Sequence, residues 1–315
     1  IELRLTQGAI KSSWYNTMQN QARGSGLFLC PLHRKEHIMT ERELREKIRQ
    51  AVEAARKECP LVPSITNTVT INLVANAQLA CGGSAAMVYL PDEGEAISSI
   101  CQAFYINMGT LFPVYAETLP RTIRALADAG KPWVLDPVGI GLGSLRTELL
   151  RQMKAMPPAI VRGNASEIIA LANLWGLATG IDKDGVRGVD ATDSVDSAVM
   201  AARALAGFIH GAVAVSGEVD VVTDGDVVIR SYGGSPLFTR VTGSGCSLGG
   251  VCAVYAAVTD PFAAAITAVN MYNAAGKIAE KKARGPGSFE KIFLDVMYSI
   301  SADDVVSNAM DTGKA

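Results

Sequence analysis

The sequence predicts an α/β fold in which a mostly parallel sheet is covered by helices on both faces. Short apolar runs that end in small or polar residues alternate with helical patterns along most of the chain. Continuous apolar runs are typical of buried parallel strands, and helices usually form the crossovers between such strands. With 315 residues, 49% of them hydrophobic, the chain can build the core of one large domain or of two smaller ones.

The first 38 residues differ from the rest. Residues 1–38 lack sustained helical or strand periodicity, and they lack the basic-then-apolar order of a signal peptide. After Met39, Thr40 and Glu43 have the spacing of a capping box at the start of an amphipathic helix. We therefore expect a single domain over residues 39–315 and an N-terminal appendage, not part of the fold, over residues 1–38. A transit peptide is the alternative for this segment, which is basic and poor in acidic residues.

The other elements follow in order along the chain. The predicted strands are the apolar runs SAAMVYL, AFYINMG, KPWVLDPVG, AIVRGN and AVAVSGEVD. The predicted helices that precede and separate them cover residues 68–81, 93–102, 114–129, 144–154 and 164–175. Alternating runs around Asp224-Gly225 predict a β-hairpin, because this dipeptide suits a tight turn. Three further helical patterns follow, at about residues 246–258, 261–284 and 287–308.

Composition excludes several kinds of protein. A formal net charge of −2 gives no electrostatic basis for binding nucleic acid or an anionic membrane, and the chain has no run of 18 or more apolar residues that would span a bilayer. The six cysteines are scattered without a CxxC pair, which is typical of reduced thiols in the cytoplasm. The three histidines offer little for a zinc site or a histidine-based triad. We expect a cytoplasmic protein.

Polar and charged residues stand where the predicted strands end. The second strand ends in Asn107, the third in Asp136, the fourth in Arg162 to Asn164, and the fifth in Ser216. Ligands of open α/β sheets bind beyond the carboxyl ends of the strands, so these residues should converge on one rim. Arg162 either clamps a phosphate through its forked guanidinium or pairs with a carboxylate at the rim.

Two carboxylates at this rim predict a magnesium site. Asp136 and Glu167 can together hold Mg²⁺, directly or through water, because that ion takes a few carboxylates together with waters and substrate phosphates. The alternative is a structural role for both residues. In that case Asp136 caps a turn before Pro137, and Glu167 lies in the exposed first turn of a helix.

The loop RVTGSGCSLGG, residues 240–250, predicts an anion site. Gly243 and Gly245 leave backbone N–H groups open, and Cys246 lies at the start of the next helix, whose N-terminus attracts negative charge. A transferring phosphoryl group would be stabilised there. The same field lowers the pKa of a thiol, so Cys246 is a candidate thiolate base. The alternative is a glycine-rich helix start with a small buried thiol. The chain has no Walker motif, and its GIGLGS loop fails the spacing of a dinucleotide fingerprint.

Six motifs together resemble a known family. ITNTVTINLVANAQLACGGSAAM, INMGTL, VLDPVGIG, VRGNASEI, SGEVDVVTDG and VTGSGC occur in the order found in hydroxyethylthiazole kinases, and the resemblance runs from about residue 40 to residue 308. It implies the ribokinase-like fold, a three-layer α/β/α sandwich with a mostly parallel central sheet. It also implies transfer of the γ-phosphate of ATP, with Mg²⁺, to the primary hydroxyl of 4-methyl-5-(2-hydroxyethyl)thiazole for thiamine diphosphate salvage. Family members assemble as homotrimers with active sites between subunits, which implies a homotrimer here.

The resemblance gives each candidate residue a role. The thiazole would contact Asn67, Met87 and Gly243, and the ATP would contact Arg162, Asn164 and Ser216. Asp136 and Glu167 would serve the metal and the phosphates, while Gly243, Gly245 and Cys246 would form the anion hole. Cys246 then occupies the position at which most ribokinase-like enzymes carry an aspartate base. Without the resemblance, core packing and helix capping would account for Met87 and Asn67.

Two other functions are compatible with this fold. One is an ATP- or ADP-dependent hydrate-repair lyase of the same superfamily, in which an aspartate would be expected where this chain has Cys246. The other is a non-catalytic nucleotide-binding regulator, which would not need Asp136, Glu167 and Arg162 together with the glycine loop. Turnover separates both of these from a kinase.

Overall fold

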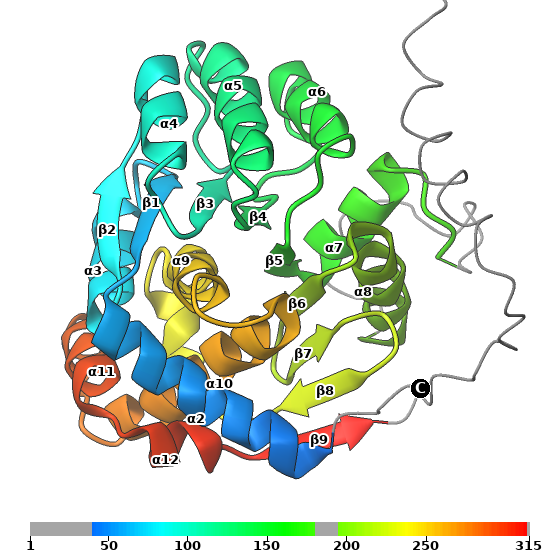
Figure 1. Cartoon of the computed structure of the whole chain (residues 1–315). Helices are drawn as coiled ribbons and strands as arrows, with labels where there is room; N and C mark the ends of the chain where they lie inside the picture. The colour runs from blue at the N-terminus through cyan, green and yellow to red at the C-terminus, as the bar shows by residue number, and fades with distance from the viewer. Residues whose placement is uncertain (1–39, 180–194, 314–315) are drawn as a thin grey trace, which may run out of the picture. The chain divides into compact units, whose positions relative to one another are not determined.

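The structure is a computed structural model that describes residues 40–179 and 195–313 (Figure 1). The predicted appendage, residues 1–38, lies outside the described residues, so the domain boundary at Met39 stays a prediction. The capping box at Thr40 is confirmed, because the Thr40 backbone N–H donates to Glu43 Oε2 over 2.8 Å and the Glu43 N–H donates to Thr40 Oγ1 over 3.3 Å. These bonds satisfy N–H groups that the helix itself cannot.

One sheet of nine strands forms the centre, in the order β2-β1-β3-β4-β5-β6-β7-β8-β9. The strands are β1 (Leu61–Ile65), β2 (Ser84–Met87), β3 (Phe104–Asn107), β4 (Trp133–Asp136), β5 (Ile160–Asn164), β6 (Ala212–Ser216), β7 (Asp220–Thr223), β8 (Val228–Ser231) and β9 (Met310–Gly313). β1 to β6 pair in parallel, and β7, β8 and β9 are antiparallel. The prediction of a mostly parallel sheet is confirmed.

Helices cover both faces of this sheet (Figure 1). On one face lie α4 (Pro91–Ser98), α5 (Tyr115–Asp128), α6 (Ser144–Met153), α7 (Ala165–Leu174) and α8 (Val195–Ile209), whose side chains share one apolar core with the strands. On the other face lie α3 (Ile71–Ala80), α9 (Ser244–Ala256) and α10 (Pro261–Glu280), against which α2 (Glu41–Glu58), α11 (Pro286–Ser299) and α12 (Ala302–Val306) pack. No helix in the described part of the chain is both long and apolar enough to cross a bilayer.

The structure differs from the sequence prediction in one helix and in two additional strands. The single helix expected over residues 287–308 is two helices, because Ile300 is extended and Ser301 begins a new capping box with Asp304. The hairpin at Asp224-Gly225 is confirmed, with Asp224 Oδ1 accepting from the N–H of Val227 over 2.8 Å. Strands β1 and β9 are additional to the predicted ones.

The alternation of side chains along β3 to β6 places the polar residues of the rim on one face. Phe104, Ile106, Leu135, Val161 and Val215 enter the core shared with α4 to α8. Their neighbours Tyr105, Asn107, Asp136, Arg162 and Ser216 therefore point to the opposite face, where α9 and α10 lie. The period of two along each strand thus gathers tyrosine, amide, carboxylate, guanidinium and hydroxyl groups beneath the start of α9.

Candidate active site

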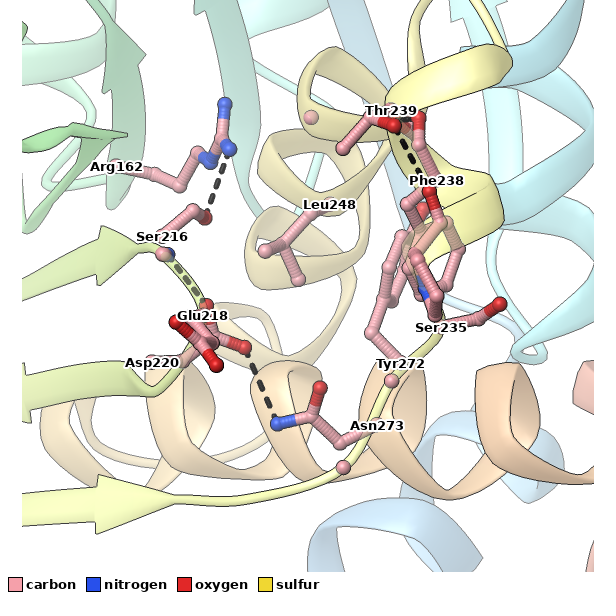
Figure 2. A pocket seen from close by; sticks show the side chains of 16 residues that line it. Arg162, Ser216, Glu218, Asp220, Ser235, Phe238, Thr239, Leu248, Tyr272 and Asn273 are labelled. Carbon is pink, nitrogen blue, oxygen red and sulfur yellow. Dashed lines mark hydrogen bonds between the residues drawn. The ribbon is translucent and has the colours of Figure 1, made fainter. Parts of the chain in front are cut away.

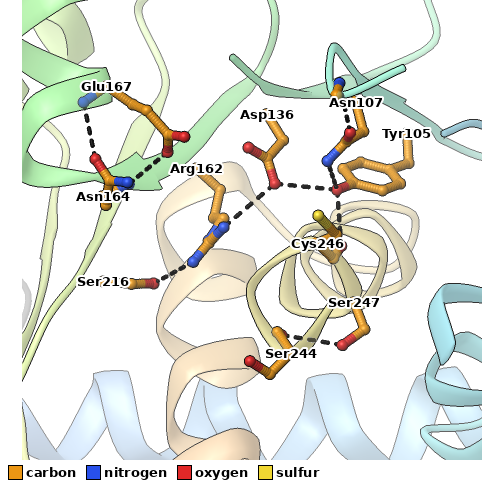
Figure 3. Close-up of polar contacts among 11 residues, drawn as sticks. Tyr105, Asn107, Asp136, Arg162, Asn164, Glu167, Ser216, Ser244, Cys246 and Ser247 are labelled. Carbon is orange, nitrogen blue, oxygen red and sulfur yellow. Dashed lines mark hydrogen bonds and ion pairs between the residues drawn. The ribbon is translucent and has the colours of Figure 1, made fainter. Parts of the chain in front are cut away.

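Arg162 and Asp136 form a buried ion pair at the centre of this rim (Figure 3). Arg162 Nη1 donates to Asp136 Oδ2 over 3.2 Å, and Nη2 donates to Ser216 Oγ over 2.8 Å. Arg162 is 7% exposed and Asp136 is 0% exposed. Buried charges need partners, and this pairing fixes the plane of the guanidinium. Of the two predicted roles for Arg162, pairing with a rim carboxylate is therefore observed, while its accessible edge still faces the pocket described below.

The two oxygens of the Asp136 carboxylate differ in their contacts. Oδ2 accepts from Arg162 and, over 3.1 Å, from the Tyr105 hydroxyl, whereas Oδ1 is buried and has no hydrogen-bond partner among the described residues. Burial raises the pKa of this carboxyl to about 6, against the opposing effect of Arg162. A buried carboxylate oxygen without a partner is the kind of group that a bound cation or its water would satisfy.

Glu167 and Asn164 form a second capping box, at the start of α7. The Asn164 N–H donates to Glu167 Oε2 and the Glu167 N–H donates to Asn164 Oδ1, both over 2.9 Å. The structural alternative for Glu167 thus holds in part, but the carboxylate is half-buried and near enough to Asp136 to contribute to the raised pKa of that group. Asp136 and Glu167 can therefore supply two carboxylates to Mg²⁺. The described residues contain no group of three or more acidic, cysteine or histidine side chains suited to a metal, so water and substrate oxygens would complete the shell.

The start of α9 lies directly above the ion pair. Its N-cap Gly243 has φ of 92°, a left-handed conformation that favours glycine, and a Cβ there would come within 2.7 Å of Thr70 Cβ. The first N–H groups of α9 have no partner within the helix. Together with Arg162 they form a positively polarised surface, which supports the predicted anion site.

The expectation that the helix N-terminus lowers the pKa of Cys246 is wrong, because the shift has the opposite direction, and the alternative of a small buried thiol fits the structure. Cys246 is buried at 9% exposure, and burial, with the nearby Asp136 charge, raises the pKa of its thiol above the ordinary value. The desolvation of the charged form outweighs the opposing effects of Arg162 and of hydrogen bonds from Thr70 and Asn107, so the neutral thiol is favoured. The side chains of Thr70 and Asn107 lie within hydrogen-bonding reach of this thiol.

A pocket of about 570 Å³ opens beside the ion pair and the start of α9 (Figure 2). Its predicted members are Arg162, Ser216 and Gly245. Other lining residues are not among the site residues predicted from the sequence: they include Asp220, Phe238, Leu248, Tyr272 and Asn273. Figure 2 shows Arg162 and Ser216 across the pocket from Phe238 and Tyr272. The volume suits a ligand of the size of a nucleotide.

Two residues of this pocket form its aromatic wall. Phe238, on the 3₁₀ helix η3 (Pro236–Arg240), stacks on Tyr272 of α10 with ring centroids 5.8 Å apart. Phe238 also contacts the edges of Phe289 and Phe293 at 5.1 and 5.0 Å. A cluster of this kind holds the wall rigid and gives a flat apolar surface opposite the cation.

Asn67 and Met87 lie at the same rim but do not line this pocket. Asn67 follows β1, and its Oδ1 accepts from Thr110 Oγ1 and from the Val69 N–H, both over 2.9 Å. Met87 ends the edge strand β2, is half-buried, and pairs in register with Ser64 of β1. Both residues therefore stand at the carboxyl ends of β1 and β2, beyond the ion pair from the aromatic wall.

The comparisons with known proteins agree with one family. The family model described as "Hydroxyethylthiazole kinase family" matches residues 52–303. A hydroxyethylthiazole kinase of Bifidobacterium adolescentis is 51% identical over 280 residues, which cover 84% of this chain and 94% of that protein. A solved hydroxyethylthiazole kinase structure from Pyrococcus horikoshii is 30% identical, covers 85% of this chain and 100% of its own, and has a TM-score of 0.75. A ribokinase-like superfamily protein from Enterococcus faecalis, 12% identical with a TM-score of 0.57, covers 84% of this chain and 96% of its own and shares the fold.

Proposed function

The chain belongs to the hydroxyethylthiazole kinase family, and from this premise we propose that it transfers the γ-phosphoryl group of ATP to the primary hydroxyl of 4-methyl-5-(2-hydroxyethyl)thiazole. The product is the thiazole phosphate used in thiamine diphosphate salvage. The observation that carries this proposal is the joining of Arg162, Ser216 and the glycine start of α9 at one end of a nucleotide-sized pocket.

The charge of the pocket orients the nucleotide. Its cationic end consists of Arg162 and the first N–H groups of α9, so the triphosphate lies there. Asp220 lines the pocket away from that end and accepts from the Asn273 side chain over 3.1 Å. A carboxylate would repel phosphate, so the nucleoside lies on the side of Asp220, Asn273 and the aromatic wall. Asn164 stays outside the lining residues and contributes the cap that holds Glu167.

Asp136 and Glu167 are the residues that would hold Mg²⁺. The fit rests on the unpartnered Asp136 Oδ1 and on the half-buried Glu167 carboxylate, whose charge acts on Asp136. When bound there, Mg²⁺ would supply positive charge that neutralises the charge developing on the transferring phosphoryl group. Arg162 contributes to the same neutralisation, and its bond to Ser216 keeps the guanidinium fork directed at the pocket.

The acceptor lies on the other side of α9's first turn, at the ends of β1 and β2. Met87 offers an apolar surface to the ring and Asn67 a polar group, and Gly243, half-buried at the N-cap of α9, offers its backbone. The hydroxyl oxygen attacks the γ-phosphorus, the bond to the β–γ bridging oxygen breaks, and ADP leaves. The hydroxyl proton is released to water late in the reaction, because a primary alcohol is a weak acid and the transition state is loose.

Cys246 occupies the base position without acting as a base in this mechanism. Its thiol is neutral, so it cannot accept the proton in the way a carboxylate would. Positioning of the two substrates and stabilisation of the transferring group by the backbone of residues 243–246 carry the reaction instead. The presence of Cys246 in place of an acid also disfavours the hydrate-repair lyase, and family membership disfavours a non-catalytic regulator.

A homotrimer and a cytoplasmic location complete the proposal. Exposed large apolar side chains follow the carboxyl ends of β1, β2 and β3: Val69, Tyr89, Leu90 and Phe112. Exposed apolar side chains of this kind are typical of an interface between subunits. The cysteines that the structure describes are all free thiols, which suits a reducing compartment. Sedimentation velocity of the full chain tests the trimer, and a monomer at micromolar concentration would contradict it.

The direct test is steady-state ADP release from Mg-ATP by the full chain, as a function of hydroxyethylthiazole concentration. The proposal predicts release that rises and saturates with the thiazole and that needs Mg²⁺. Release at the same rate without the thiazole would indicate an ATPase. Binding of ATP without any release would instead support the regulator.

A further inference from the structure

Tyr105 lies at the centre of the active-site network but does not line the pocket. It is in the middle of β3, 0% exposed, and its side chain faces α9. Its hydroxyl lies 2.7 Å from the backbone carbonyl oxygen of Cys246 and 3.1 Å from Asp136 Oδ2, and it accepts from Asn107 Nδ2 over 2.9 Å (Figure 3). One hydroxyl thus joins three elements of the site: β3, β4 and the first turn of α9.

A glycine in α9 makes room for the Tyr105 ring. Gly249 lies one turn after Cys246 in α9, and a Cβ there would come within 2.5 Å of Tyr105 Cε2 and within 2.7 Å of its hydroxyl oxygen. A glycine inside a helix destabilises that helix relative to alanine. Here it allows the helix backbone to approach the ring, which brings the Cys246 carbonyl within hydrogen-bonding distance of the hydroxyl.

Each contact of the Tyr105 hydroxyl constrains a group that acts in phosphoryl transfer. The single hydroxyl proton is shared between the Cys246 carbonyl and Asp136 Oδ2. The first contact fixes the height and rotation of the α9 first turn, whose N–H groups face the transferring phosphoryl. The second, with the bond from Arg162, holds Oδ2 and so directs Oδ1, the free oxygen, away from the ion pair.

We propose that Tyr105 is a positioning residue, whose hydroxyl sets Asp136 and the first turn of α9 in register for phosphoryl transfer. This inference rests on the proposed function. Asn107 belongs to the same hydrogen-bond network, because its Oδ1 accepts from the Gly109 N–H over 2.9 Å while its Nδ2 donates to Tyr105. Gly109 connects this hydrogen-bond network to the acceptor side, since a Cβ on Gly109 would lie 2.4 Å from Asn67 Nδ2.

Tyr255 provides a matched control. It is also a fully buried tyrosine, and it lies on α9 itself, but its hydroxyl has no hydrogen-bond partner among the described residues. Removing that hydroxyl deletes the same atom without deleting a contact to the active site. Tyr105→Phe and Tyr255→Phe therefore separate a positioning role from a general effect of a buried hydroxyl.

The experiment compares the two variants with the full wild-type chain in two measurements. Steady-state kinetics gives kcat and KM for ATP and for hydroxyethylthiazole, and hydrogen exchange gives the protection of the peptide covering residues 243–250. For Tyr105→Phe we expect kcat to fall about tenfold with both KM values within about twofold of wild type, because positioning acts in the transition state. We also expect faster exchange in that peptide. Tyr255→Phe should match the wild type in both measurements.

Three outcomes would overturn the inference. The first is equal behaviour of Tyr105→Phe and Tyr255→Phe in kcat and in exchange. The second is a rise in both KM values at unchanged kcat, which would indicate loss of uniform binding rather than of positioning.

If the wild type shows no thiazole-dependent turnover, the proposed function fails by itself. The exchange measurement then still decides whether Tyr105 fixes the start of α9, and unchanged exchange would be the third contrary outcome.

Discussion

Gly245 lies directly against the guanidinium of Arg162. A Cβ built on Gly245 would come within 2.8 Å of both Nη1 and Nη2 of Arg162. The first turn of α9 and the cation therefore present one continuous surface to the pocket, and only a residue without a side chain permits this contact. The contact with Arg162 therefore gives a structural reason for a glycine at position 245, in addition to the anion-binding role that the sequence predicts.

Gly245→Ala should raise the KM for ATP about tenfold, because the added methyl group must displace either Arg162 or the helix start. Steady-state kinetics with varied ATP measures this. Gly207→Ala is the control: Gly207 is exposed near the end of α8 and a Cβ there meets nothing within 4 Å. It should leave activity unchanged and stabilise the protein by about 0.5–1 kcal/mol. An unchanged KM in Gly245→Ala would contradict the close contact.

Arg162→Ala should weaken the binding of ATP more than that of the thiazole, because Arg162 lines the pocket proposed to bind the nucleotide. It also leaves the Asp136 carboxylate buried without its cation, which destabilises the protein by about 3 kcal/mol at pH 7. Separate KM values for the two substrates, with thermal unfolding, measure both effects. Arg151→Ala, on the exposed side of α6, is the control for loss of a positive charge. Equal weakening of the two substrates would refute the assignment of Arg162 to ATP.

Asp136 should make stability depend on pH. Burial raises the pKa of its carboxyl from 3.8 to about 6, so between these values the folded protein keeps a proton that the unfolded chain has released. The free energy of unfolding should therefore fall as pH rises from about 4 to about 6, by up to about 3 kcal/mol relative to Asp136→Asn, whose amide does not titrate.

Urea unfolding of wild type and Asp136→Asn at pH 4, 5, 6 and 7 measures this difference. Other titrating groups cancel between the two proteins, so the slope of the difference belongs to position 136. If the difference in unfolding free energy between the two proteins stays constant, or favours the wild type more as pH rises, burial does not raise the pKa of the Asp136 carboxyl.

Cys246→Asp should retain or increase activity. Burial keeps the thiol neutral, whereas a carboxylate at the same position can accept the hydroxyl proton. Measurement of kcat with both substrates saturating tests this, and Cys252→Ala, which alters another buried thiol on α9, is the control. Loss of activity in Cys246→Asp with folding and ATP binding intact would mean that the small neutral thiol itself is required.

The sequence predicts most of the fold because buried parallel strands have a strong signature. β1 is not predicted because its sequence, LVPSI, contains Pro63, and proline argues against a strand that is paired on both sides. β9 is not predicted because MDTG is short and without apolar alternation. The break between α11 and α12 is visible in the sequence only through Ser301 and Asp304, whose capping spacing lies inside a longer apolar period.

The site is predictable where a residue belongs to a strand end or a glycine loop, and not elsewhere. Arg162, Asp136, Ser216 and Gly245 come together as the rim argument requires. Phe238, Tyr272 and Asn273 come from later elements that meet only in the folded chain, so no local spacing marks them. Tyr105 has the appearance of an ordinary core aromatic in AFYINMG, and only the position of the α9 backbone reveals what its hydroxyl contacts. Burial, which reverses the expected pKa shift of Cys246, is likewise a tertiary property.

The identity of the products tests the proposed phosphoryl transfer, and ³¹P NMR of the full chain with Mg-ATP and hydroxyethylthiazole follows them. We expect ADP and a phosphate monoester of the thiazole alcohol to form in equal amounts, and neither to form without the thiazole. Release of inorganic phosphate in place of the ester, or ADP formation that is independent of the thiazole, would contradict the proposed phosphoryl transfer.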